Sequence, residues 1–236
     1  MCFFFPFKYT LFANSSLHGS PTVRALFWEF PDEPELFAID RQFMIGSDIL
    51  VTPVLTPNVS TVEGIFPGRG RVRWRDWYTH HVVNASSGTN TTLDAPLGHV
   101  NVHIRDNSAL LLHAKPAYTI EETRKGPFAL LVSLSSSGDA FGTAFLDDGI
   151  SFPPGPSTTL SFAAHGGKLS ITPSGNFTIE QKMEEITILG VGSKPSRVSV
   201  QGQVSSEFQF YEPQQKLVIA NTSLDLNDPV TLVWAQ

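Results

Sequence analysis

Short apolar segments follow one another along most of this chain, from residue 22 to its end. Turns rich in Gly, Pro, Asn and Ser separate them, and they recur about every 8–12 residues, a spacing typical of antiparallel β-sandwiches. We expect strands at residues 49–55, 100–104, 109–112, 128–134, 140–146, 160–162, 168–171, 177–179, 185–189, 198–200, 207–210, 216–219 and 230–234. The pattern therefore predicts a mainly β protein.

The first twenty residues have a different period. Phe7 and Leu11 lie four residues apart, which is the spacing of one helix face. Gly19 can end such a helix in a left-handed conformation, and Pro21 prevents the helix from continuing. One helix is therefore expected before the strands begin.

Residues 23–30 form a near-continuous apolar run that Pro31 closes. Such a run predicts a strand buried on both faces, as in a parallel sheet covered by helices. The same part of the chain is rich in Phe, since ten of the 18 Phe residues lie in the first 66 positions. The N-terminal segment is therefore expected to come from a larger core than the later strands.

Composition limits the class of protein. The formal net charge is −6 and 16% of residues are charged, against about 25% in typical proteins. These values exclude a disordered acidic tail and argue against a nucleic-acid partner. No stretch of about 18 apolar residues is present, so no membrane-spanning helix is expected. The single cysteine allows neither an intrachain disulfide nor a cysteine zinc site.

Six of the nine asparagines stand in Asn-x-Ser/Thr sequons, although Ser and Thr make up fewer than one residue in five. This excess favours a lineage of the secretory pathway, in which these asparagines are candidates for N-glycosylation. The candidates are Asn14, Asn58, Asn84, Asn90, Asn176 and Asn221. The first residues do not form a signal peptide, because Pro6 and Lys8 interrupt the apolar run. We therefore expect the chain to be the later part of a longer secreted polypeptide.

Histidines and arginines were tested as ligands of metals and phosphates. His99 and His103 are roughly 13 Å apart if both lie on one strand, too far to share a zinc ion, so a solvated strand face is expected. Arginines alternate along residues 69–75, and a solvated face is again favoured over nucleic-acid binding, with the neighbouring tryptophans in the core. Trp77 and Tyr78 remain candidates for stacking against a sugar.

Carboxylates do not form a recognisable catalytic pair. A retaining glycosidase needs two carboxyl groups about 5–5.5 Å apart. Asp147 and Asp148 are neighbours whose side chains point apart on an extended chain, and Gly149 indicates a turn. From the residues alone we assign no catalytic residue, no cofactor and no metal ligand.

The order of the segments nevertheless resembles the end of the catalytic barrel and the two C-terminal β-domains of glycoside hydrolase family 31, in its α-glucosidase (maltase) branch. The resemblance runs in order through essentially the whole chain and is most specific between residues 19 and 54. The segments that carry it are 5–12, 19–32, 40–54, 95–105, 145–149 and 186–191.

The resemblance implies a fold of two antiparallel β-sandwich domains preceded by the last helix and strand of a β/α barrel. It implies a barrel remnant at residues 1–45, a proximal β-domain at 46–115 and a distal β-sandwich domain at 116–236. Family members hydrolyse terminal α-linked glucose with retention, using two aspartates that would lie upstream of this chain.

The resemblance thus implies a portion of an α-glucosidase whose β-domains brace a barrel and which is inactive alone. Its partners would be the rest of the barrel, on the same or a separate chain, and an α-glucoside or maltooligosaccharide substrate. Two alternatives stay open: a stand-alone carbohydrate-binding β-sandwich, and a docking half of a split glycosidase.

Overall fold

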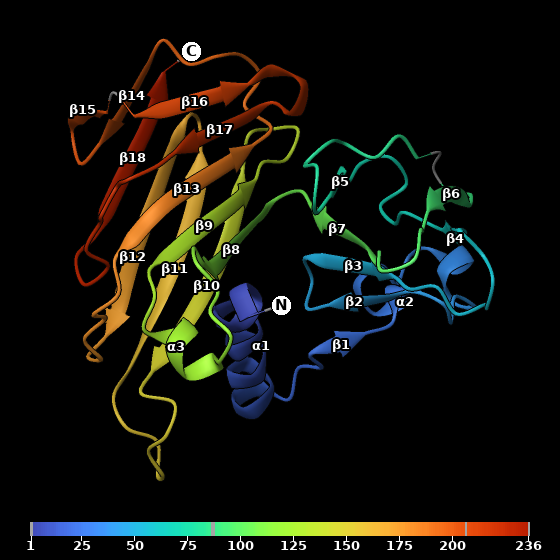
Figure 1. Cartoon of the computed structure of the whole chain (residues 1–236), viewed down its shortest axis with the longest axis horizontal. Coiled ribbons are helices and arrows are strands. Elements are labelled where there is room, and N and C mark those ends of the chain that lie inside the picture. The colour runs from blue at the N-terminus through green and yellow to red at the C-terminus, as the bar shows by residue number, and fades with distance from the viewer. Residues whose placement is uncertain (1, 86–87, 206, 236) are drawn as a thin grey trace. The chain divides into compact units, whose positions relative to one another are not determined.

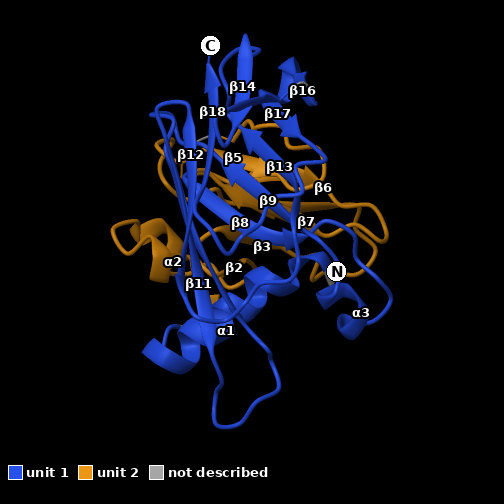
Figure 2. Cartoon of the chain, turned by 90° about the vertical axis from the view of Figure 1, so that its left-hand side faces the viewer, with its two compact units in different colours: residues 1–20, 107–236 blue, residues 21–106 orange. Residues whose placement is uncertain are grey.

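The computed structural model describes residues 2–85, 88–205 and 207–235. The chain divides into two compact units, which are described separately (Figure 2). The larger unit combines residues 1–20 with residues 107–236, and the smaller unit comprises residues 21–106. The domain boundaries near residues 45 and 115 stay predictions.

The expected N-terminal helix is present in the larger unit. After a 3-10 turn, Cys2–Phe4, helix α1 spans Phe5–His18 and has a proline in its first turn, where no amide donor is needed. Gly19 ends it in the left-handed conformation, with φ of 72°, and donates to the Ser15 carbonyl at 2.9 Å. The helix packs against strands β10 and β8, where the Thr10 hydroxyl accepts a hydrogen bond from the Phe145 amide at 3.0 Å.

The larger unit is built on an eleven-stranded sheet with the order β15-β14-β18-β12-β11-β10-β8-β9-β13-β17-β16. Most neighbours are antiparallel, but β13 pairs with β9, and β10 with β8, in parallel. Helix α3 (Ile120–Arg124) precedes β9. The strands are β8 (Ser108–His113), β9 (Phe128–Ser133), β10 (Ala140–Asp147), β11 (Ser157–His165), β12 (Lys168–Gly175), β13 (Met183–Leu189), β14 (Arg197–Val200), β15 (Gln203–Ser205), β16 (Phe208–Tyr211), β17 (Lys216–Ile219) and β18 (Val230–Ala235). A 3-10 turn, Glu212–Gln214, links β16 to β17.

This sheet folds over itself, so that its two halves face each other across one core (Figure 1). The fold lies between β10 and β8, which share a single paired position, Phe141 with Ser108. Buried side chains from both halves meet in the core, among them Leu130 of β9, Phe162 of β11 and Trp234 of β18. The prediction of a β-sandwich is confirmed for this unit.

The smaller unit contains a five-stranded sheet with the order β1-β2-β3-β7-β5 and a two-stranded ribbon of β4 and β6. A cluster that includes Leu26, Met44, Leu50 and Trp74 forms its core. The strands are β1 (Val23–Arg24), β2 (Phe43–Ile45), β3 (Ile49–Thr52), β4 (Thr61–Gly64), β5 (Trp74–Asp76), β6 (Thr91–Asp94) and β7 (Asn101–Arg105), and the helical turns are α2 (Leu26–Glu29) and Pro34–Leu36.

The predicted strand at residues 23–30 is wrong beyond its first two residues. β1 ends at Arg24 and pairs antiparallel with β2, not in the parallel manner of a barrel strand. The chain then turns through α2, because Leu26 and Phe30, four residues apart, are both buried whereas Trp28 is exposed. A short apolar run does not distinguish a strand from a helical turn, and here the helical period decides.

The predicted strand at residues 177–179 is also absent. Side chains satisfy its backbone instead of a neighbouring strand. The Thr158 hydroxyl donates to the Phe177 carbonyl at 2.9 Å and accepts from the Phe177 amide at 3.0 Å. The Asn227 amide group does the same for Ile179, at 2.8 Å for each bond.

Candidate functional site

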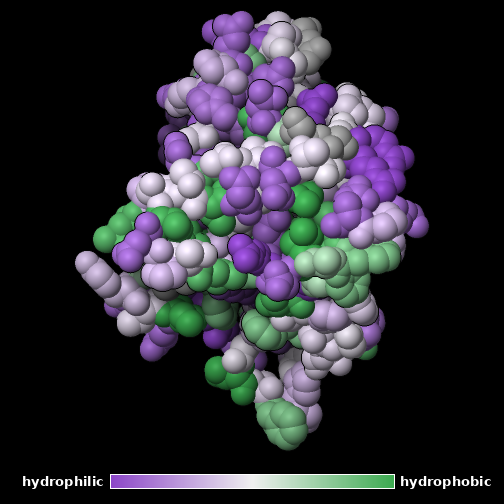
Figure 3. All heavy atoms as spheres, turned by 90° about the vertical axis from the view of Figure 1, so that its right-hand side faces the viewer, coloured by the Kyte–Doolittle hydropathy of each residue, from purple (hydrophilic) through white to green (hydrophobic). Residues whose placement is uncertain are grey.

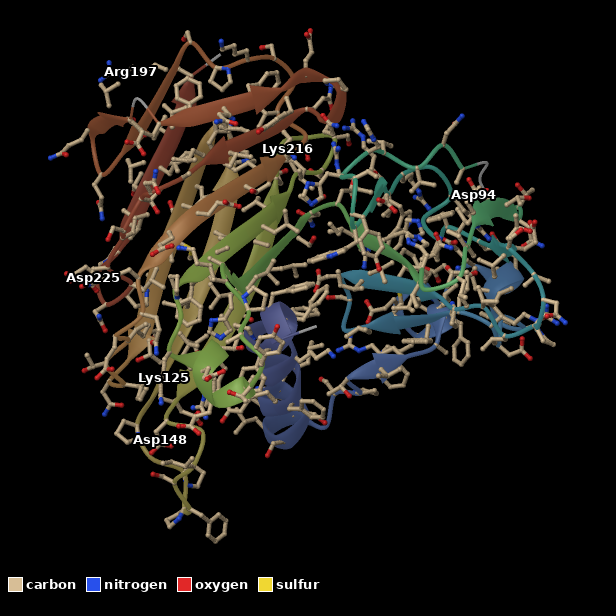
Figure 4. The ribbon with its side chains drawn as sticks, viewed as in Figure 1. Asp94, Lys125, Asp148, Arg197, Lys216 and Asp225 are labelled. Atoms are coloured by element: carbon tan, nitrogen blue, oxygen red, sulfur yellow. The ribbon has the colours of Figure 1, made fainter. Side chains whose placement is uncertain are left out.

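A groove of about 770 Å³ lies in the larger unit. We call it the Tyr9 groove. Its apolar lining includes Phe5, Phe128 and Ile150, and charged groups such as Arg124 and Asp148 also line it. Figure 4 shows Asp148 and Lys125, another lining residue, near the same end of this unit. The mixture of apolar and charged groups suits an amphipathic ligand.

Tyr9 links helix α1 to the end of strand β10. Its hydroxyl donates to Oδ1 of Asp147 at 2.7 Å, and the same oxygen accepts the Gly149 amide at 2.8 Å. Burial and the bond to Asp147 raise the pKa of Tyr9 to about 12. Asp147 therefore fixes the helix and the turn, and sequence reasoning missed this pair because 138 residues separate its members.

Asp148 and Gly149 form the turn that the sequence predicts. Asp148 accepts the amides of Ile150 and Ser151 at 3.1 and 3.0 Å, and the Ser151 hydroxyl, the largest of the causes, holds the pKa of Asp148 below its usual range. Arg124 donates to the Asp148 carbonyl at 2.6 Å. Gly149 has a φ of 66°, in the left-handed region that favours glycine. Both carboxylates of the Asp147-Asp148 pair thus serve the turn.

His113 lies at the base of the Tyr9 groove. Its ring stacks on Phe128 with centroids 5.0 Å apart, and only 4% of the residue is exposed. Burial lowers the pKa of His113, so the ring is kept neutral. Its Nδ1 atom has no hydrogen-bond partner.

The smaller unit has its own groove, of about 410 Å³, along the β4–β6 ribbon. We call it the ribbon groove. Its apolar side chains include Ile39, Val54, Leu55 and Val59, and its polar ones include Asp40, Arg41, Glu63 and Asn90. One sequon asparagine, Asn90, is therefore part of its lining.

A cluster of charged groups lies where α2 meets β1, β3 and β7. Glu29 pairs with Arg24, and its other oxygen lies 3.7 Å from Nη1 of Arg105. The Arg105 guanidinium lies 4.7 Å above the Phe30 ring, a cation–π contact. Burial raises the pKa of the neighbouring Asp48. The opposing charges balance one another, which is typical of a structural cluster.

Trp77 and Tyr78 follow strand β5 in a turn that Asp76 holds by accepting the Tyr78 and Thr79 amides. Tyr78 is 56% exposed, its hydroxyl donates to the Val100 carbonyl at 3.1 Å, and its ring lies 4.9 Å from that of His99. Trp77 is only partly exposed. Tyr78 can therefore offer a ring to a ligand, and its role in sugar stacking stays a prediction.

The sequon asparagines differ in exposure. Asn58, Asn84, Asn90, Asn176 and Asn221 are exposed, whereas Asn14 is half-buried within α1. The Asn221 amide donates to Glu207 at 2.7 Å. Asn84 precedes residues 86–87, which lie outside the described residues. Glycosylation of all six stays a prediction.

Two predictions about charged side chains are wrong. His103 does not lie on a solvated face with His99, because β7 begins at Asn101 and its first and third residues point inward. His103 is 2% exposed beside Phe66, and burial lowers its pKa to about 4. Arg75, expected on a solvated face, is fully buried and donates to the His80 carbonyl at 3.2 Å.

The arginines between residues 69 and 75 do not share one strand face as predicted. Residues 68–70 form a turn with positive φ, so one continuous strand does not run from residue 69 to residue 75. Burial lowers the pKa of Arg75 to about 10. Trp74 is buried, as expected, and its indole donates to the Pro67 carbonyl at 2.8 Å. Arg69 instead pairs with Glu35 through two bonds of 2.8 and 2.9 Å at the surface.

The described part of the chain contains neither a cluster of metal ligands nor a helix that could span a membrane. Within residues 2–85, 88–205 and 207–235, no three His, Cys, Asp or Glu side chains are grouped to hold a metal ion. No helix of that part is long and apolar enough to cross a membrane.

Comparison with known proteins identifies the region. The model of the glycosyl hydrolase family 31 C-terminal domain matches residues 19–110. An α-glucosidase of Schizosaccharomyces pombe is 44% identical over 214 residues, which is 91% of this chain and 22% of that protein. This chain is a C-terminal portion of a family 31 glycosyl hydrolase. An α-glucosidase of Aspergillus niger is also 44% identical, over 84% of this chain and 20% of its own length. The family 31 chain thus spans about a fifth of the relatives it matches.

Solved structures agree on the fold. The glucosidase II alpha subunit matches 99% of this chain and 28% of its own, with a TM-score of 0.84 and 22% identity. A family 31 dextranase of Flavobacterium johnsoniae matches with a TM-score of 0.79 and 18% identity. At this identity the likeness shows that the family 31 chain shares their C-terminal fold.

Proposed function

We propose that this chain is the bracing portion of an α-glucosidase that hydrolyses terminal α-linked glucose with retention. A β/α barrel outside the chain supplies both catalytic carboxylates, and the chain alone releases no glucose. The observation that carries this proposal is the match of 91% and 84% of the chain to two proteins named α-glucosidase, of which it spans about a fifth. The neighbourhoods of Asp147 and Asp148 support it, since both carboxylates hold a turn.

Helix α1 provides one surface for the barrel. Phe7 and Thr10 are buried on the side toward the sheet, while Phe12 and Leu17 are 62% and 65% exposed. Large apolar side chains that are exposed together on one element are candidates for contact with another part of the protein. A barrel lying on the outer side of α1 would cover these residues.

The smaller unit also exposes aromatic side chains. The rings of Phe27 and Phe37 meet edge to face, with centroids 6.1 Å apart, and are 41% and 58% exposed. Trp28 is 57% exposed beside them. The face drawn in Figure 3 carries green, hydrophobic side chains in several places among purple, hydrophilic ones. Clustered exposed aromatics are typical of interaction surfaces.

Activity tests the proposal directly. The chain is produced in a host without α-glucosidase, alone and together with the remaining part of the Aspergillus niger enzyme, and glucose release from 4-nitrophenyl α-glucoside is measured. The proposal expects no release from the chain alone and release from the pair. Release by the chain alone would refute it.

Substitution of Phe12 by serine tests the docking surface. Burying a Phe side chain stabilises by about 1.5–3 kcal/mol, so we expect about 10- to 100-fold weaker association with the barrel portion. Tyr118, an equally isolated aromatic that is fully exposed, provides the control variant Tyr118→Ser. Equal loss of association in both variants, or in neither, contradicts a docking role for α1.

A second candidate function is carbohydrate binding by the chain itself, which the exposed Tyr78 ring favours. This candidate expects maltooligosaccharide binding that disappears in Tyr78→Ala or Trp77→Ala and persists in Tyr118→Ala. Unchanged binding in the first two variants would exclude it. We further propose a route through the secretory pathway, which the sequons support.

A further inference from the structure

The ribbon groove exposes apolar side chains that need a cover. Val54, Leu55 and Val59 line it and are 36%, 63% and 43% exposed. Asp40 and Glu63 lie along the same hollow and carry hydrogen-bonding oxygens. An occupant must therefore combine apolar surface with hydroxyl or amide groups.

A sequon asparagine lies within this lining. Asn90 directly precedes β6, whose first residue, Thr91, is paired with Gly64 at the end of β4. Asn90 is exposed, and the Thr92 hydroxyl that completes its sequon donates to Oε1 of Glu63 at 2.6 Å. A group attached to Asn90 thus starts at the edge of the groove.

We propose that Asn90 carries an N-linked glycan and that its first sugars lie in the ribbon groove. The proposal rests on the secretory route proposed above. In the transfer, Nδ2 of Asn90 loses a proton and bonds to C1 of the reducing-end N-acetylglucosamine. The C1–O bond of the lipid pyrophosphate donor breaks, and the pyrophosphate leaves with the electron pair.

The chemistry of the sugar matches the groove. The C–H faces and acetamide methyl of N-acetylglucosamine are apolar and can pack on Val54, Leu55 and Val59. Its hydroxyls and amide can bond to Asp40 and Glu63. The volume of about 410 Å³ lies within the usual range of ligand pockets, about 300–1,000 Å³.

Attachment favours this occupant over a free sugar. A short flexible tether gives an effective concentration in the millimolar range, so even weak contacts keep the glycan in place. Asn221 offers a comparison, because it is exposed beyond the end of β17 and no residue of its sequon lines either groove. Its glycan should remain free in solution.

The whole chain is expressed in a yeast secretory host and recovered from the medium and the secretory compartments. Glycopeptide mapping measures occupancy at Asn90 and Asn221. An endoglycosidase that cuts between the two core N-acetylglucosamines is then applied to the folded protein. We expect both sites to be occupied and the Asn90 glycan to be cut about tenfold more slowly in wild type than in Leu55→Ser. Cleavage at Asn221 should be the same in both proteins.

Val59→Ser is a second groove variant in case Leu55→Ser does not fold, and Thr92→Ser keeps the sequon as a control. If Asn90 is unmodified while Asn221 is modified, this proposal is overturned and the secretory route is not. An absence of glycans at every sequon overturns it together with the secretory route. Equal Asn90 cleavage in wild type and both groove variants refutes the packing. None of these outcomes depends on docking to a barrel or on glucose release, so the bracing role is tested separately.

Discussion

Gly142 lies where the large sheet folds over itself, and its replacement by alanine should strongly destabilise the larger unit. The residue belongs to β10, next to the single position at which β10 pairs with β8. A Cβ at this position would lie 2.0 Å from the Ala109 carbonyl oxygen and 2.9 Å from its carbon. Because both atoms belong to the backbone, a side-chain rotation cannot relieve the overlap.

The magnitude follows from the shift that is required. A carbon and a carbonyl oxygen approach to about 3.3 Å at closest, so β8 and β10 must separate by about 1.3 Å. Overpacking of this kind costs about 1–3 kcal/mol, and a backbone shift places Gly142→Ala at the upper end or beyond. For a chain of this size, 3 kcal/mol corresponds to a decrease in Tm of roughly 6–12 °C.

Urea and thermal unfolding, followed by circular dichroism, measure this change. Gly155→Ala is the matched control, because a Cβ there would lie 3.6 Å from the Ser151 Cβ, an ordinary contact. The control should stay within about 0.5 kcal/mol of wild type. Gly142→Ala with the stability of wild type would refute the argument that the fold of this sheet requires glycine.

Three further perturbations test individual side chains. Burial of His103 keeps its pKa at about 4, below the unfolded value of about 6.5, so the folded state binds fewer protons between these values. The stability of the smaller unit should therefore fall by on the order of 2–3 kcal/mol from pH 6.5 to pH 4, and urea titrations of His103→Asn should show a flatter dependence. Tyr9→Phe removes one hydrogen bond and should cost about 1 kcal/mol in urea unfolding at pH 7. Because the pKa of Tyr9 is raised to about 12, the contribution of its protonated form is complete below pH 10 and disappears through pH 12, which absorbance titration can follow. Trp74→Phe leaves the buried Pro67 carbonyl without its donor and should cost about 1–3 kcal/mol by the same assay, whereas Trp28→Phe at an exposed position should change stability by less than about 0.5 kcal/mol.

Local features of the fold could be predicted from the sequence. The helix stop at Gly19 and the strands predicted for the larger unit, except the one at residues 177–179, are confirmed to within a few residues, because apolar runs between Gly, Pro and Asn fix them locally. The parallel pairing of β9 with β13 could not be predicted, since a crossover of this kind depends on distant residues. The failure at residues 23–30 has a local cause, because a run of eight residues of which six are apolar fits the period of a strand and that of a helix.

Functional geometry was less predictable than secondary structure. Tyr9 and Asp147 meet only because α1 packs across β10, and nothing in their local sequence indicates a partner. The burial of His103 depends on where β7 begins. If the strand were shifted by one residue, the His103 side chain would lie on the opposite face of the sheet. A sequon can be identified from three consecutive residues of the sequence. Only the structure distinguishes Asn90 from the other sequon asparagines, because Asn90 lines the ribbon groove.

The excess of Phe in the first 66 residues has two structural sources. Phe7 and Phe66 are buried, each within a different unit, so the excess does not fill one core. Phe12, Phe27 and Phe37 are between 41% and 62% exposed, each forgoing part of the about 1.5–3 kcal/mol that full burial of such a side chain provides. Exposed apolar side chains that gather on one face are typical of surfaces that another part of a protein contacts. The Phe residues of this segment therefore divide between the cores of the two units and exposed surfaces. In the proposed enzyme, the barrel covers those surfaces.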